Sequence, residues 1–157
     1  VRFSKDKTPY KTSWSGSFKR STKQLRGGYY FHIEPGNSFL GGGFWGPSPS
    51  DLKLIRNNIL EYGDELKKIL SSESFINAFG ELKGEQLKTC PKGFDKEHKH
   101  IDLLRFKQFI VSQNFSDEEV LSEDFSKKVS DGFRSMRTFF DYMSEALTTD
   151  ANGEPLY

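Results

Sequence analysis

Cysteine is almost missing from this chain. Cys90 is the only one among 157 residues, which excludes an intrachain disulfide. A single thiol is typical of proteins from a reducing compartment, so we expect a cytoplasmic location. The sequence also has no apolar run near the ~20 residues that span a bilayer and no signal peptide at its start. We therefore expect neither a disulfide-rich secreted domain nor a membrane protein.

Several signatures of common enzymes are missing as well. The three glycines at 41–43 precede no Lys-Ser or Lys-Thr pair, so there is no P-loop. No G-x-G-x-x-G follows an expected strand, and no G-x-S-x-G marks a hydrolase elbow. The sequence accordingly indicates no cofactor.

A metal site would have to draw its ligands from one part of the chain, namely Cys90, Asp95, Glu97, His98, His100 and Asp102. Lys96 and Lys99 flank the two histidines and would repel a cation, and the position of Cys90 fits no standard zinc spacing. We expect no metal and interpret these histidines as exposed loop residues.

What the chain does contain is aromatic: 15% of it, with 15 Phe. That share, at this length, predicts one folded domain over 1–157 with a real core. We expect a β-rich basic part at 1–47, a mixed part at 48–147 and a tail at 148–157. The fold class is α+β, a mostly antiparallel sheet packed against two long helices.

Apolar spacing and turn residues locate the elements. Steps of three and four predict helices near 49–71, with Ser48 as N-cap, and 122–147, with a short helix over 73–79. The shared apolar face of the first long helix comprises Leu52, Ile55, Ile59, Tyr62, Leu66 and Ile69. Alternation and Gly/Pro punctuation predict strands over 12–19, 29–34 and 38–45. A further strand is expected within 103–115, and Ser116 with Glu119 forms a capping-box pattern. Glycines 41–43 indicate a bulge or a close approach by a neighbour or ligand.

The net charge of +1 conceals an uneven distribution. Residues 1–26 hold eight basic residues and one acid, whereas the remainder holds 15 basic and 21 acidic residues. A basic end attracts phosphates, nucleic acid or an acidic partner, although a solvated lysine-rich hairpin is an equal alternative. Aromatic residues alternate with these cations as on nucleic-acid surfaces, but for Trp14 and Phe18 we favour the core.

His32 is the histidine that the sequence places beside a carboxylate and a tyrosine in an expected strand. Alternation in an extended strand places Tyr30, His32 and Glu34 on one face, which makes an acid–base pair of His32 and Glu34 plausible. A structural histidine satisfied by the backbone is the favoured alternative.

Several motifs resemble those of one family. They are residues 2–12 (R-F-S-K-D-K-T-P-Y-K-T), residues 28–36 (G-Y-Y-F-H-I-E-P-G), glycines 41–43 with Trp45 and Pro47, the set Leu52, Ile55, Arg56 and Ile59, and Leu87, Lys88, residues 91–94 and His98. Over most of its length the chain resembles the bacterial and fungal family called domain of unknown function 2461, and its end at 122–157 resembles members from Bacteroidetes-like bacteria. The resemblance carries no established activity. It implies a helical segment before residue 2 that this chain lacks, so we expect a truncated N-terminus and an exposed apolar patch.

Two functions stay open. The first is a module or enzyme that binds a phosphorylated or carboxylated small molecule in a basic pocket lined by glycine and aromatic residues. Its expected ligand-binding residues are Arg2, Lys5, Lys7, Lys11, Gly42 and Trp45, with His32 or His98 as the proton carrier. The second is a non-catalytic module for nucleic acid or an acidic protein. A concave basic cluster favours the first function and a flat one favours the second; the oligomeric state stays open.

Overall fold

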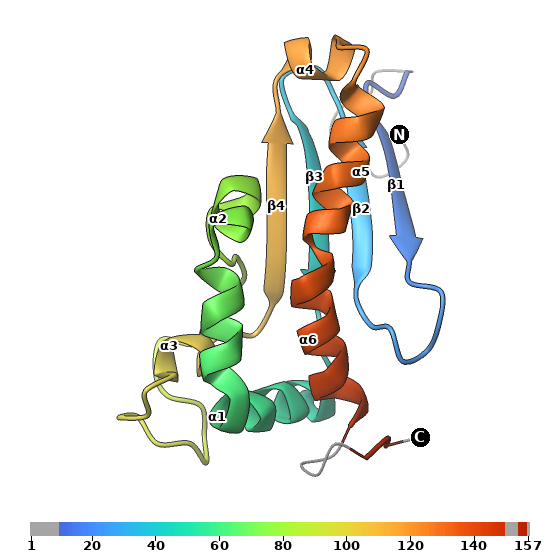
Figure 1. Cartoon of the computed structure of the whole chain (residues 1–157). Coiled ribbons are helices and arrows are strands. Elements are labelled where there is room, and N and C mark those ends of the chain that lie inside the picture. The colour runs from blue at the N-terminus through green and yellow to red at the C-terminus, as the bar shows by residue number, and fades with distance from the viewer. Residues whose placement is uncertain (1–9, 150–153, 157) are drawn as a thin grey trace.

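Four strands form one antiparallel sheet in the computed structural model, which describes residues 10–149 and 154–156. They are β1 (Trp14–Lys19), β2 (Gly28–Ile33), β3 (Ser38–Phe44) and β4 (Phe109–Phe115), in the order β1-β2-β3-β4. The strands expected over 12–19, 29–34 and 38–45 are confirmed and follow one another as a meander (Figure 1).

The long helix α1 (Pro49–Leu70) begins where the sequence predicts. Ser48 Oγ accepts the Asp51 N–H at 3.1 Å, and Ile55 and Ile59 on the predicted face are fully buried. Tyr62 departs from that prediction, since it is 49% exposed and has non-helical φ and ψ of −117° and 18°. Its carbonyl accepts the Tyr142 hydroxyl at 3.3 Å, so the helix bends at this point.

Residues 103–115 are a strand only in part. A helical turn, α3 (Ile101–Leu104), comes first, and β4 starts at Phe109. The Arg56 guanidinium donates to the carbonyls of Leu104, at 2.9 Å, and Phe106, at 3.3 Å. These carbonyls are thus satisfied by a side chain rather than by a neighbouring strand.

The predicted short helices are also present. Helix α2 (Glu73–Phe79) is present, and Ser116 and Glu119 form the capping box that begins α4 (Asp117–Leu121). The helix expected over 122–147 is present as two segments, α5 (Phe125–Ser135) and α6 (Arg137–Thr148). Near the junction, the Ser135 hydroxyl donates to the Asp131 carbonyl at 2.9 Å, a contact that bends helices.

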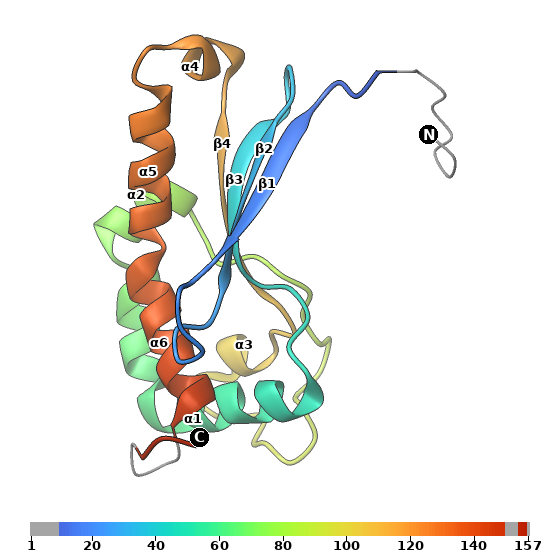
Figure 2. The ribbon, with the colours of Figure 1, turned by 90° about the vertical axis from the view of Figure 1, so that its right-hand side faces the viewer.

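The fold is therefore α+β, with α1 and the α5–α6 pair as its long helices. Figure 2 shows α5 and α6 along one face of the sheet, with the first half of α1 below it. Leu40, Phe109 and Val111 of the sheet are buried in the same cluster as Met136 and Phe140 of the helix layer. This apolar burial is the main source of stability.

The consecutive glycines of β3 are explained by close neighbours. A Cβ on Gly42 would overlap the Met136 sulfur and lie 2.9 Å from Phe140 Cζ, so the helix layer packs directly on that backbone. Gly43 has a φ of +135°, and a side chain there would collide with the Phe109 carbonyl of β4. The expected close approach is confirmed, and its agents are α6 and β4.

Trp14 and Phe18 correct our expectation of core residues. Trp14 is 74% exposed and Phe18 is 54% exposed, because β1 is the edge strand of the sheet. Phe18 still stacks on Phe31, with ring centroids 6.0 Å apart, and borders an apolar cleft between β2 and α5 that Phe133 also lines.

Candidate functional site

A cavity of about 620 Å³ lies between the β1–β2 loop and the end of β3. Four cationic side chains line it, namely Lys19, Arg20, Lys23 and Arg26. They share its wall with Thr22, Leu25, Gly27, Gly28, Gly43 and Trp45, so none of the described lining residues is acidic. We call this cavity the basic pocket.

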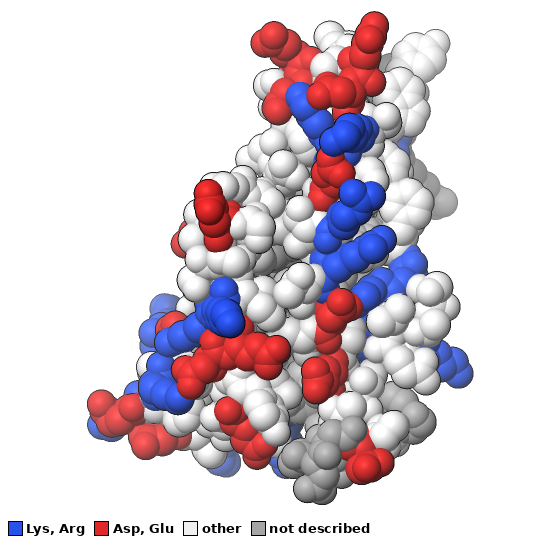
Figure 3. Space-filling view, viewed as in Figure 1, with Lys and Arg blue, Asp and Glu red and all other residues white. Residues whose placement is uncertain are grey.

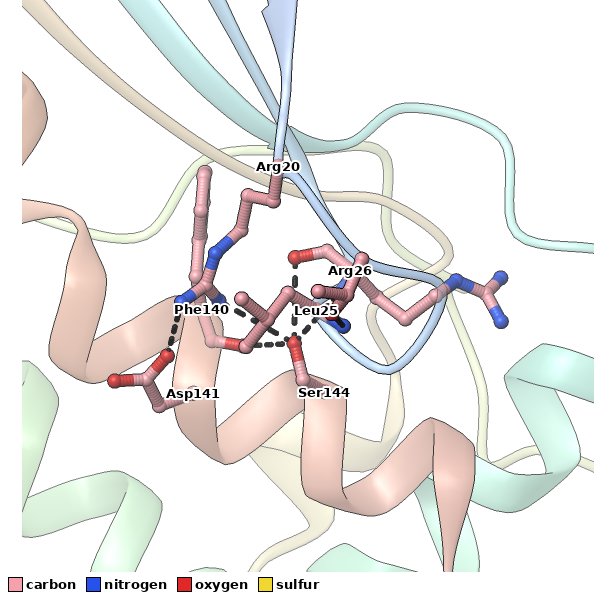
Figure 4. Close-up of polar contacts among 7 residues, drawn as sticks. Arg20, Leu25, Arg26, Phe140, Asp141 and Ser144 are labelled. Carbon is pink, nitrogen blue, oxygen red and sulfur yellow. Dashed lines mark hydrogen bonds and ion pairs between the residues drawn. The ribbon is translucent and has the colours of Figure 1, made fainter. Parts of the chain in front are cut away.

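Ser144 of α6 anchors the loop that forms the pocket (Figure 4). Its Oγ accepts the Arg26 N–H at 2.8 Å and donates to the Phe140 carbonyl, 2.6 Å away. Arg20 reaches the same hydroxyl at 3.4 Å and forms an ion pair with Asp141 at 2.5 Å. The loop is thereby fixed to α6, more than a hundred residues later in the chain.

The four cations differ in whether they are already paired. Arg20 is paired with Asp141, and the Arg26 guanidinium lies 3.3 Å from the Asp51 carboxylate. Neither Lys19 nor Lys23 has an ion-pair partner among the residues that the structure describes. The two lysines thus supply positive charge that no acidic residue in the described part of the chain compensates.

A second cavity, of about 480 Å³, adjoins the basic pocket and has Phe18 and Tyr29 among its lining residues. The two cavities share Lys19, Gly28 and Trp45 as lining residues. Tyr30, Phe39 and Ser17 line the second one further along. We call it the aromatic cavity.

Three side chains beside the aromatic cavity form a hydrogen-bonded chain. Tyr30 Oη lies 3.3 Å from His32 Nδ1, and His32 Nε2 lies 3.1 Å from Glu34 Oε2. Hydrogen bonds from Asn37 and then His32 hold the pKa of Glu34 below its usual value, so this carboxylate is ionised at neutral pH. An ionised Glu34 accepts from Nε2–H, which leaves Nδ1 as acceptor for the Tyr30 hydroxyl. The shared face expected for these residues is present, and the arrangement suits proton transfer.

His98 lies elsewhere and lines neither cavity. Its Nδ1 accepts the His100 N–H at 3.2 Å. The His100 ring is buried against Gly63, and its Nε2 lies 3.3 Å from the Asp64 carboxylate but outside hydrogen-bond geometry. Burial lowers the pKa of His100 although Asp64 opposes the shift. The expectation that both histidines are exposed is therefore wrong, since His100 is buried and His98 is half-buried.

The remaining ligand-binding residues from the sequence have different outcomes. Arg2, Lys5 and Lys7 lie outside the described residues. Lys11 is exposed just before β1, whereas Trp45 follows β3, at the opposite end of the sheet. The structure therefore does not bring Lys11 to Trp45.

Of the predicted set, Trp45 lines both cavities. Gly42 is buried on the helix side, where its packing against Met136 and Phe140 accounts for it. The basic residues of the loop over 20–28 could have indicated the pocket from the sequence. From the sequence alone, they are interpreted only as part of a basic N-terminal end.

Within the described residues, no group of three or more His, Cys, Asp or Glu is placed to hold a metal ion. The residues that line the two cavities supply cations, hydroxyls and aromatic rings as binding groups.

The family described as "Conserved hypothetical protein (DUF2461)" matches residues 1–142. The chain belongs to this family, which confirms the resemblance seen in its motifs. Comparison with curated proteins and with solved structures gives no match. Among the described residues, no helix combines the length and the apolar character that crossing a membrane would require.

Proposed function

We propose that this protein binds an anionic small molecule, with a phosphate or carboxylate group, in the basic pocket. One observation carries the proposal: Lys19 and Lys23 face a cavity and have no ion-pair partner among the described residues. A ligand anion supplies the missing negative charge through charge-assisted hydrogen bonds.

The shape of the site supports a small ligand. Both cavities fall within the ~300–1,000 Å³ that is typical of small-molecule sites. The loop that carries the cations is held by Ser144 and Asp141, so little ordering is needed when a ligand binds.

Cations on the face covered by α5 and α6 lie among acids, unlike Lys19 and Lys23 of the basic pocket. Figure 3 shows Lys and Arg of this face interspersed with Asp and Glu, without a broad surface of one sign. Lys127 and Arg134 both pair with Asp131, at 2.8 and 3.2 Å. Nucleic acid and acidic proteins are bound by extended unpaired basic surfaces, so the concave basic pocket favours a small ligand over the alternative partners.

For acid–base chemistry on the ligand, we propose His32 rather than His98. The Tyr30 hydroxyl in contact with His32 belongs to a residue that lines the aromatic cavity, whereas His98 lines neither cavity. Glu34 would orient the imidazole by accepting its Nε2–H.

Calorimetry with inorganic pyrophosphate tests the binding site. We expect the affinity of Lys19→Ala/Lys23→Ala to be at least roughly tenfold weaker than that of wild type, because two unpaired cations are removed. Lys92→Ala/Lys96→Ala is the matched control: it loses the same charge from an exposed loop that lines neither cavity. Equal loss in both double variants would reduce the effect to net charge, and absence of binding to wild type would refute the proposal.

A further inference from the structure

We infer that the ligand of the basic pocket also carries a flat aromatic or heteroaromatic ring, bound in the aromatic cavity, as in a nucleoside monophosphate. The inference rests on the proposed function, because it assigns the anionic end of the ligand to the basic pocket. Lys19, Gly28 and Trp45 line both cavities, so one molecule can occupy both.

Trp45 provides an open surface for stacking. Its side chain is 44% exposed, and its indole has no ring partner among the described residues, in contrast to Tyr30 and Phe39, whose centroids lie 5.8 Å apart. Large exposed rings that lack a ring partner are the groups on which bases and other flat ligands stack.

Gly41 lies beneath the indole of Trp45. A Cβ at Gly41 would lie 3.7 Å from Trp45 Cζ2 and 3.8 Å from Phe39 Cε2. Gly41 is buried and lines neither cavity, so its missing side chain lets the indole lie close to the backbone of β3. A ring that is held in place in this way loses less freedom when a ligand stacks on it.

Aromatic residues form most of the lining of the aromatic cavity. Five of its eight lining residues are Phe18, Tyr29, Tyr30, Phe39 and Trp45. Rings of this kind pack against a flat aromatic group in stacked or edge-to-face geometry, which favours a ring over an alkyl chain. Ser17 and Lys19 also line the cavity and can donate hydrogen bonds to the ring nitrogens or exocyclic oxygens of a heterocycle.

The chain has two tryptophans, which gives a direct spectroscopic test. Trp14→Phe leaves Trp45 as the only indole, and Trp14 lines neither cavity. We expect AMP to quench the fluorescence of this variant, because the base stacks on Trp45. Ribose 5-phosphate, which has the phosphate but no base, should leave the emission nearly unchanged.

Affinities measured by calorimetry complete the test. We expect wild type to bind AMP at least tenfold more tightly than ribose 5-phosphate. That ratio should fall toward one in Trp45→Leu and persist in Trp14→Leu, which removes an exposed tryptophan outside both cavities.

Three outcomes separate the two claims. Equal affinities for AMP and ribose 5-phosphate without quenching would overturn this inference, while pyrophosphate binding that depends on Lys19 and Lys23 would leave the proposed function standing. Binding that strengthens steadily with the length of a single-stranded oligonucleotide would also overturn it, in favour of a nucleic-acid strand. No binding of pyrophosphate, AMP or ribose 5-phosphate would refute both.

Discussion

Ser144 Oγ accepts the backbone N–H of Arg26 at 2.8 Å, across 118 residues of sequence. The hydroxyl is buried, and it also lies 3.4 Å from the Arg20 guanidinium. One serine on α6 thereby fixes both arginines that flank the basic pocket. The position of the pocket depends on this contact.

We expect Ser144→Ala to lower the free energy of unfolding by about 1–2 kcal/mol, because the partly buried Arg26 N–H loses its acceptor. It should also weaken pyrophosphate binding severalfold, since the loop is no longer held to α6. Urea unfolding and calorimetry measure the two effects. Ser135→Ala is the control: its exposed hydroxyl bonds only within the helix region, to the Asp131 carbonyl. Unchanged binding in Ser144→Ala would mean that the loop holds its shape without α6.

Gly42→Ala should be strongly destabilising. The added methyl would overlap the Met136 sulfur and lie 2.9 Å from Phe140 Cζ, both in the buried core. Overpacking of this kind costs about 1–3 kcal/mol. Gly46→Ala offers a matched control, because nothing lies within 4 Å of the added Cβ. Similar melting temperatures for the two variants would contradict the tight packing of α6 on β3.

Arg56→Met tests the link between α1 and the segment before β4. Arg56 donates to the carbonyls of Leu104 and Phe106, and both would lose their donor. We expect a loss of about 2–4 kcal/mol in urea unfolding. Lys53→Met, on the same helix and exposed, should change stability by less than about 0.5 kcal/mol. A small effect at Arg56 would show that water satisfies the two carbonyls.

Stability should fall in mild acid because of His100. Burial holds the pKa of His100 below its usual 6.5. At a pH just below 6.5 the histidine is therefore protonated in the unfolded chain but still neutral in the folded protein. Asp64 faces the ring and favours its charge, whereas Lys67, Lys99 and His98 oppose it. The unfolding free energy should decrease as pH falls below 6.5, by at most about 1.4 kcal/mol per pH unit for one proton.

His100→Gln cannot take up that proton, so its stability should depend less on pH between 7.5 and 5.5. Denaturant unfolding at several pH values measures the difference from wild type. His32→Gln keeps His100 and serves as the comparison. Parallel pH profiles for His100→Gln and wild type would assign the acid sensitivity to other groups.

Local pattern predicted most of the elements. The steps of three and four in α1, the Ser48 cap and the Ser116–Glu119 capping box each depend on residues close together in sequence, and all three are confirmed. The bend at Tyr62 was not predictable, because its carbonyl bonds to Tyr142, eighty residues later. Trp14 and Phe18 were misplaced because alternation gives two faces of a strand but does not show which strand lies at the edge.

The candidate site was also predictable from the sequence only in part. The run Tyr30, His32 and Glu34 could be placed on one face from strand alternation, and Trp45 from its position after the glycines. The pairing of Arg20 with Asp141 could not be predicted. Nor could the finding that Lys19 and Lys23 have no ion-pair partner within residues 10–149 and 154–156. Which cations stay free for a ligand depends on which acids the fold brings to the others.

The sequence by itself determined the family, the α+β class, the order of strands and helices, and the basic character of the first 26 residues. These follow from motifs, spacing and composition, which act over a few residues. Only the tertiary structure decided that the cations of the β1–β2 loop surround a cavity beside Trp45, because that depends on the contact of Arg26 with Ser144 of α6. A hydrogen bond between residues so distant in the chain forms only once the helix layer has packed on the sheet.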